Sequence, residues 1–286
     1  RKTHSLIITG NGGTNSESAA IIDADSQMDK DDGQRYNIGS FSLDSTAKGR
    51  HAANELITKT EKIIIKDGIT TINSAAFASF QSLTKITIPN SVKKIGDFAL
   101  KDCKRLQQIT IPASVVKIGG GAFENCTNLY DIKFESGSNC NSMENYPNNP
   151  GSSPIQNCKS LRTFQMPNRI KYISKYFFEG CDSLESVSFG KNFRGYQMTF
   201  GDENIFDDSS SLLSKKLQKI KVAKSNPYLE SIDGILYDKQ QKRLLLYPRG
   251  RISTTYRVPK GTKSMSDSAF RLCDRLQTVI ISDKKL

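Results

Sequence analysis

Residues 95–111 read IGDFALKDCKRLQQITI, and 23 residues further along residues 118–134 read IGGGAFENCTNLYDIKF. Three other segments follow the same template: residues 72–88 (INSAAFASFQSLTKITI), 173–189 (ISKYFFEGCDSLESVSF) and 265–281 (MSDSAFRLCDRLQTVII). The shared pattern is I-x3-A-F-x2-C-x2-L-x2-I-x-I, and looser copies end near Met166 and Val222. A repeat of this length predicts one elongated solenoid in place of two compact domains.

The alternation Leu-x-x-Ile-x-Ile places apolar side chains on one face of a short strand and the intervening residues on the other. One such strand cannot bury its apolar face alone, whereas stacked copies form a continuous core. We therefore predict an α/β fold, a leucine-rich-repeat solenoid shaped as a horseshoe of about seven repeats of roughly 23 residues. Short strands line its concave face, and short helical turns, such as one around residues 122–123, connect them.

Five of the six cysteines occupy one position of the template, at Cys103, Cys126, Cys158, Cys181 and Cys273. Phe80 takes this position in another copy, which argues against a metal cluster and favours a small buried hydrophobe. Cys140 is out of register with this column, and it is expected to be exposed or to pair with a neighbour such as Cys158.

The motif A-F-x2-C-x2-L-x2-I-x-I-P resembles the BspA-type leucine-rich repeats of surface and secreted proteins from anaerobic bacteria and some parasitic protists. The resemblance covers roughly residues 61–281. Residues 225–248, SNPYLESIDGILYDKQQKRLLLYP, resemble a β-hairpin inserted between such repeats. The opening SLIITGNG resembles an N-terminal cap strand of the family. The chain stops directly after a repeat strand, from which we expect the native protein to continue past Leu286.

These patterns divide the chain into an N-terminal cap region, residues 1–60, and a repeat solenoid, residues 61–286. Insertions are expected at residues 135–155 and 223–256, where the repeat is interrupted.

Side chains between the apolar strand residues are expected to point outward and to form a partner-binding row on the rigid scaffold. A merely solvated face is the alternative. The row that we predict to bind a partner contains Lys85, Thr87, Gln108, Thr110, Asp131, Lys133, Thr163, Gln165, Ser186, Ser188, Lys219 and Lys221.

The net charge of +12 is concentrated in one segment, because residues 213–263 contain 13 Lys or Arg and three acidic residues. Such a segment attracts acidic partners, although a solvated surface that maintains solubility explains it equally well. Besides Lys219 and Lys221, the candidate polyanion-binding residues are Lys215, Lys216, Lys242, Arg243, Arg249 and Arg251.

The catalytic inventory is poor. The two histidines, His4 and His51, lie outside the repeats, and the chain has no nucleophile-elbow, zinc-protease or phosphate-loop motif. We expect no enzyme activity, no cofactor and no metal site.

Two hypotheses for function follow. The first is a surface or secreted adhesion module that binds a host or neighbouring-cell protein through its concave face, as the family resemblance implies. The second is a polyanion binder, with a sulfated glycan as its ligand, that uses the basic segment 213–263. Nucleic acid ranks below both, because no recognised nucleic-acid-binding fold accompanies the basic residues. No stretch is long and apolar enough to insert into a membrane.

Overall fold

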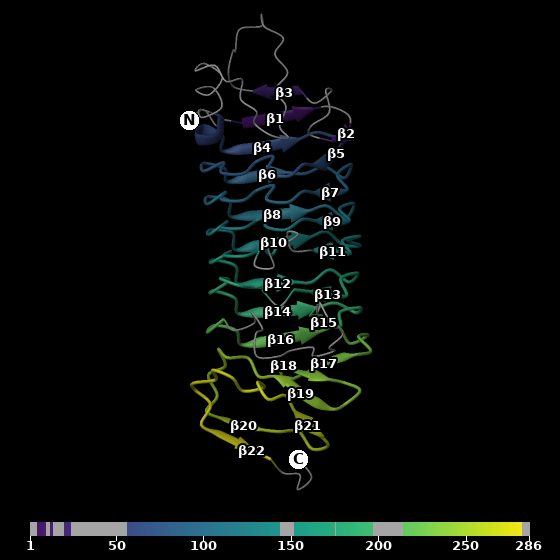
Figure 1. Cartoon of the computed structure of the whole chain (residues 1–286), viewed down its shortest axis with the longest axis vertical. Helices are drawn as coiled ribbons and strands as arrows, with labels where there is room; N and C mark the ends of the chain where they lie inside the picture. Colours follow the sequence, from purple (N-terminus) through teal and green to yellow (C-terminus); the bar gives the residue numbers. More distant parts are fainter. Residues whose placement is uncertain are drawn as a thin grey trace, which may run out of the picture.

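The computed structural model of the chain describes residues 5–9, 12–13, 20–23, 56–143, 152–174, 176–196 and 214–281. These residues form a solenoid of about eight turns, stacked along one long axis (Figure 1). The predicted leucine-rich-repeat solenoid is therefore confirmed. Each regular coil contributes a strand to a first column, a shorter strand to a second column, and an arc of turns that closes the coil.

The first strand column contains the Leu-x-x-Ile-x-Ile segments, and its neighbours are parallel. Its members are β1 (Ser5–Thr9), β4 (Lys62–Ile65), β6 (Lys85–Thr87), β8 (Gln108–Ile111), β10 (Asp131–Phe134), β12 (Thr163–Gln165), β14 (Ser186–Phe189) and β16 (Lys219–Val222). The register pairs equivalent residues of neighbouring coils: Ile63 is the partner of Ile86, and Ile109 is the partner of Ile132. β3 (Ala20–Asp23) pairs antiparallel with β1.

The second strand column follows the terminal Pro of the template. Its members are β2 (Gly12–Gly13), β5 (Ile69–Ile72), β7 (Lys94–Ile95), β9 (Lys117–Ile118), β11 (Ser142–Met143), β13 (Tyr172–Ile173) and β15 (Gly195–Tyr196). They are short because each coil must turn again within a few residues. Like the first column, they pair in parallel, with Ile95 opposite Ile118.

The third side of each coil is a column of turns, where we expected short helices. In the described part of the chain, only residues 56–59 are helical. The backbone amides of Phe98 and Leu100 donate to the carbonyls of Gly120 and Ala122 in the following coil, both at 2.8 Å. Phe98 and Asp102 have positive φ, 56° and 61°. These left-handed residues prevent a continuous helix and turn backbone amides toward the neighbouring coil. The backbone hydrogen bonds of this column therefore join coils instead of forming within a helix.

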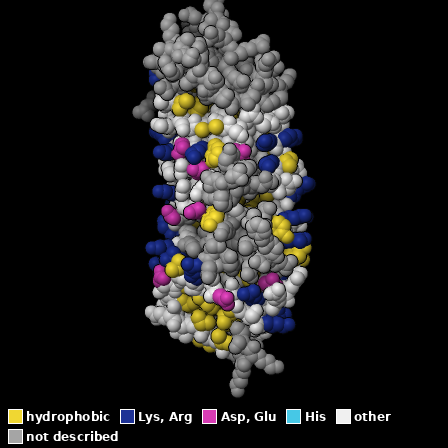
Figure 2. Space-filling view, viewed as in Figure 1, with side chains coloured by type: hydrophobic (Ala, Val, Ile, Leu, Met, Phe, Trp, Pro, Cys, Tyr) yellow, Lys and Arg dark blue, Asp and Glu magenta, His cyan; other side chains and the backbone are white. Residues whose placement is uncertain are grey.

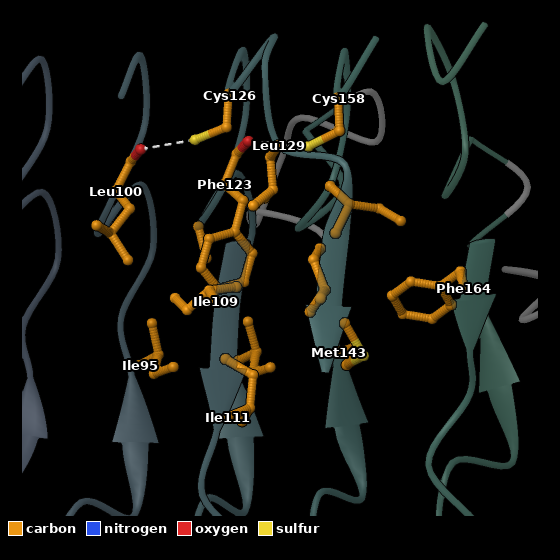
Figure 3. Packing of buried hydrophobic residues seen from close by; sticks show 14 of the residues in the cluster. Ile95, Leu100, Ile109, Ile111, Phe123, Cys126, Leu129, Met143, Cys158 and Phe164 are labelled. Atoms are coloured by element: carbon orange, nitrogen blue, oxygen red, sulfur yellow. Dashed lines mark hydrogen bonds between the residues drawn. The ribbon is translucent and has the colours of Figure 1, made fainter. Parts of the chain in front are cut away.

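The core runs inside this column of coils. Ile95, Leu100, Ile109 and Phe123 come from adjacent coils and point toward one another (Figure 3). All four are buried, with at most 2 % of their surface exposed. Because every regular coil is covered on both sides by similar residues, one core cluster extends from Leu6 to Leu246.

The predicted hairpin is confirmed and extended. β17 (Leu229–Ile232), β18 (Ile235–Asp238) and β19 (Arg243–Leu246) form an antiparallel meander, and β19 pairs with β21 (Ser264–Met265). Beyond it, β20 (Thr255–Arg257) pairs in parallel with β22 (Thr278–Ile280). A second core cluster fills this end of the molecule, and its buried members are Ile235, Tyr237, Leu244, Tyr247, Tyr256, Val258 and Ala269.

Buried Asn226 joins the regular coils to this insertion. Its side-chain amide donates to the carbonyls of Gly190 and Phe193, both at 2.9 Å. Its side-chain oxygen accepts from the backbone amides of Tyr228 and Leu229, at 2.8 and 2.9 Å. All four hydrogen-bonding positions of the side chain are therefore used at the point where the meander begins.

Candidate interaction surfaces

The predicted partner-binding row, called here the outer row, lies on six strands of the first column. Lys85 and Thr87 project from β6, and Gln108 and Thr110 project from β8; all four are exposed. The remaining members occupy the equivalent alternate positions of their strands, and all except the buried Ser186 are exposed or half-buried; they are Asp131, Lys133, Thr163, Gln165, Ser186, Ser188, Lys219 and Lys221. The alternation of outward and inward side chains thus follows the two-residue period of a strand.

The register divides the outer row into groups. Gln108 and Thr110 are the partners of Asp131 and Lys133. A second group runs across three strands, where Ser186 has Thr163 on one side and Lys219 on the other. Exposure is uneven in this group, because Ser186 is buried and only 7 % exposed whereas Lys219 is exposed. Ser186 is therefore the least accessible member of the predicted row.

A hollow that sequence reasoning did not locate lies beside the first group. Its volume is about 490 Å³ and its lining residues are Gln107, Asn128, Tyr130, Ser160, Arg162 and Ser183. Gln107, Tyr130 and Arg162 directly precede the first residues of β8, β10 and β12. They therefore form a second line of polar side chains that runs along the coils beside the outer row. The Gln108 side-chain amide donates to the Tyr130 hydroxyl, which connects the outer row to this hollow.

A second hollow, of about 450 Å³, lies where the meander meets β16. Lys219 and Lys221 line it together with Arg251, Ser231 and the exposed Ile252. The Arg251 guanidinium donates to the Asp233 carboxylate at 2.7 Å and to the Asp233 carbonyl at 2.6 Å. Arg251 is therefore partly neutralised within the protein, while the two lysines supply the unbalanced charge of the hollow.

The candidate polyanion-binding residues differ in exposure and in their partners within the protein. Lys215, Lys216 and Lys242 are exposed, whereas Arg243 and Arg249 are half-buried. Arg249 pairs with Asp274 at 3.3 Å and also donates to the carbonyl of Leu272 at 2.8 Å. Arg249 and Arg251 thus hold the last coils together, and within the basic segment 213–263 the lysines are the better candidates for an external anion.

Four members of the cysteine column, Cys103, Cys126, Cys158 and Cys181, are buried as predicted, whereas Cys273 is half-buried. Each thiol donates to a carbonyl of the preceding coil; Cys103 reaches Phe77 and Cys126 reaches Leu100, both at 3.1 Å. Figure 3 shows the Cys126 bond. Burial raises the pKa of Cys103 to about 12, so this thiol stays protonated at neutral pH and is a poor nucleophile.

The prediction for Cys140 is wrong. This thiol is free and fully buried, and it forms no disulfide with Cys158. Cys140 lies three residues before Met143, just as Val115 lies three residues before Ile118, and β11 pairs in register with β9. Residues 135–143 therefore continue the coil, and Cys140 fills the position of a core valine. The matching spacing C-x-x-M and V-x-x-I was the signal in the sequence.

Three further expectations from the sequence concern metal sites, histidines and membrane-spanning helices. In the residues that the structure describes, no group of three or more His, Cys, Asp or Glu is placed to hold a metal ion. Both histidines lie outside these residues. The described part of the chain also contains no helix with the length and apolar character needed to cross a membrane.

Comparison with known proteins identifies the repeat. The profile of the BspA type leucine rich repeat region matches residues 54–149 and 148–231, in six copies, which is more than half of the chain. No curated protein matches in a sequence comparison.

Several solved structures resemble the chain at low identity. The pneumococcal vaccine antigen PcpA is 21 % identical over 78 % of this chain and 45 % of its own, with a TM-score of 0.46. A leucine-rich repeat protein from Eubacterium ventriosum is 20 % identical over 96 % of this chain and 57 % of its own, with a TM-score of 0.46. A leucine rich cell surface protein from Faecalibacterium prausnitzii is 19 % identical over 77 % and 65 %, with a TM-score of 0.47. The chain thus spans less than two thirds of the length of each of these three proteins.

Proposed function

The chain belongs to the BspA-type leucine-rich repeat family, and on that premise we propose that it is a non-enzymatic adhesion module that binds a protein partner through the outer row. A surface or secreted location is part of the proposal, and it rests on the character of the family. The partner is a protein of a host or a neighbouring cell.

The observation that carries the proposal is the first group of the outer row. Gln108, Thr110 and Lys133 are exposed on two hydrogen-bonded strands whose opposite faces are buried in the core. A binding surface on such strands loses little conformational freedom when a partner docks, because the backbone is already ordered. The adjoining hollow with Tyr130, which is 40 % exposed, offers an aromatic contact of the kind that is enriched at protein interfaces.

A second candidate function is polyanion binding through the basic segment 213–263. The exposed side chains of Lys215, Lys216, Lys219 and Lys221 favour it, because the first two precede β16 and the last two lie on it. The internal ion pairs of Arg249 and Arg251 reduce the charge that the segment can offer a ligand.

The test is a panel of purified extracellular-matrix glycoproteins, immobilised and probed with the chain by biolayer interferometry. The variant Gln108→Ala/Thr110→Ala/Tyr130→Ala should bind the glycoprotein that the parent chain binds at least about tenfold more weakly. Truncating a central contact of an interface commonly costs more than about 1 kcal/mol of binding free energy. A matched control, Lys104→Ala/Arg105→Ala/Gln81→Ala, changes three exposed residues outside the strands. Equal loss in both variants, or no binding to any panel member, would contradict the proposal.

A further inference from the structure

We propose that the second strand column carries a binding site for a linear sulfated glycan, on a surface other than the outer row and other than the basic segment 213–263. The site is a basic ridge defined by Lys93, Lys94, Lys117, Lys171, Lys191 and Arg194. This inference is independent of the protein-binding role proposed above.

The ridge gathers charge from coils that are distant in sequence. The four segments 89–95, 112–118, 167–173 and 190–196 contain seven Lys or Arg and no Asp or Glu. Each segment forms the same part of its coil, the second strand and the turn before it. Figure 2 shows Lys and Arg side chains along the edge of the molecule on which this column lies in Figure 1. A count along the chain does not detect the cluster, because no single segment is very basic.

Backbone pairing sets the positions of these cations. Lys94 of β7 is the register partner of Lys117 of β9. The amide of Val116 donates to the carbonyl of Lys93 at 2.8 Å, and the amide of Arg194 donates to that of Lys171 at 2.8 Å. Neighbouring strands are about 4.8 Å apart, so the cations of β7 and β9 lie close together, as do those at β13 and β15. The coil of β11, where Ser142 is the register partner of Lys117 and residues 135–143 contain no Lys or Arg, separates the two groups.

This arrangement is unfavourable for the protein alone. Like charges directly opposite one another across two strands are destabilising. Among the described residues, Lys93, Lys94 and Lys171 form no ion pair. On the turn column, by contrast, Lys101 pairs with Glu124 at 3.0 Å. The charges of Lys93, Lys94 and Lys171 are therefore available to an external anion, whereas Arg194 also stacks on the ring of Tyr228 at 4.5 Å.

The composition of the ridge favours a sulfated glycan over other polyanions. Single-stranded nucleic acid is usually held by aromatic side chains that stack on successive bases, but Tyr172 is the one exposed aromatic side chain described on these four segments. Binding to an anionic membrane surface normally combines basic residues with a broad apolar face, and Val116 is the only large exposed aliphatic side chain described here. A linear polymer of sulfate groups requires cations in a row and neither of these additions.

The experiment compares two variants of equal charge on the full chain. The ridge variant is Lys93→Gln/Lys94→Gln/Lys171→Gln/Lys191→Gln, and the matched control is Lys104→Gln/Arg105→Gln/Lys159→Gln/Arg275→Gln. All eight side chains are exposed, and the control residues lie outside the outer row and outside segment 213–263. Binding of a size-defined heparin fragment is measured by titration between 50 and 200 mM salt, with desulfated heparin, single-stranded DNA and phosphatidylserine vesicles as competing probes.

We expect the ridge variant to lose about three units from the slope of log K against log salt, because roughly 0.7 counterions are released for each contact to a flexible polyanion. The control should retain the slope of the parent. The melting temperature of the ridge variant should stay close to that of the parent, because all four substitutions are at exposed positions.

Four results would overturn the proposal. Greater loss in the control would place the site away from the ridge. Equal loss in the two variants would show a general effect of net charge. Equal affinity for desulfated heparin would exclude sulfate recognition, and stronger binding to DNA or vesicles would identify another class of partner.

Discussion

The regular coils and the C-terminal end of the molecule bury their apolar side chains in different ways. In the coils, each buried side chain has a counterpart above and below it, and backbone hydrogen bonds cross between coils on all three sides. At the C-terminal end, seven buried residues from the meander and from the coils beyond it form a separate cluster, in which Tyr237 and Tyr256 share a hydrogen bond between their hydroxyls. Repetition thus fills the coil core with apolar side chains that carry no hydroxyl, among them Phe77 and Phe123, whereas the C-terminal cluster buries tyrosines whose hydroxyls bond to each other.

The largest expected effect comes from removing a core aromatic ring in the coils. Phe123→Ala should lower the free energy of unfolding by about 3–5 kcal/mol, because Phe123 is fully buried between two coils that cannot collapse onto the cavity. Urea unfolding followed by circular dichroism measures this loss.

The counterpart in the C-terminal cluster is Tyr256→Ala on β20, and hydrogen exchange distinguishes the effects of the two substitutions. Phe123→Ala should expose amides of β8 and β10, whereas Tyr256→Ala should expose amides of β20 and β22 and leave the coils protected. If Tyr256→Ala opened β8 as readily as β22, the two regions would not be separate units.

The junction between the regions gives the next effect. Asn226→Ala should destabilise the chain by about 3 kcal/mol, because it leaves two carbonyls and two amides without their partners. Ser225→Ala, at the exposed neighbouring position, should stay within about 0.5 kcal/mol of the parent. The free energy of unfolding, measured in urea, checks both values, and a loss below about 1 kcal/mol for Asn226→Ala would indicate that water replaces the side chain.

The smallest effect concerns the thiols of the coils and depends on pH. Burial raises the pKa of Cys103 to about 12, whereas an unfolded thiol ionises near pH 8.5. The folded state therefore keeps a proton that the unfolded state loses, so stability is complete below about pH 8.5 and falls as the pH rises toward 12. Cys103→Ala should reduce the loss of stability between pH 7 and pH 10 by about 2 kcal/mol.

The control for this pH dependence is Ser136→Ala, which changes an exposed residue that does not titrate. It should lose as much stability between the two pH values as the parent, as judged by urea unfolding at each pH. An unchanged loss in Cys103→Ala would mean that this thiol is accessible to base in the folded chain.

The fold was predictable because the buried strand residues recur at a fixed spacing, and stacking of the coils is the arrangement that buries all of them. A strand that buries Leu106, Ile109 and Ile111 in one coil must meet similar residues in the next, so the spacing alone indicates a stacked core. The turns were not predictable as such. Their hydrogen bonds depend on left-handed residues, for which Asp102 and Asn125 before the cysteines were the available signal.

The candidate surfaces were predictable only in part. Strand alternation placed the outer row on the correct strands, but it could not reveal that Ser186 is buried or that Arg251 binds Asp233. Nor could it reveal the ridge, because Lys94 and Lys171 become members of one surface only after the coils are stacked. Spatial neighbours across coils are set by register, and charge counts along the chain ignore register.

The cysteine column gives the molecule a direction of growth. Every thiol of the column with a hydrogen bond to another coil donates backward, as Cys126 does to Leu100 and Cys181 to Ile155. The acceptor is thus always made before the donor when a ribosome synthesises the chain from its N-terminus. Each emerging coil therefore finds the thiol acceptors of the coil before it in place, while the turn amides of that coil, such as Phe98, gain their acceptors from the newcomer. Every coil is thus completed by its successor, which favours assembly from the N-terminal end, one coil at a time.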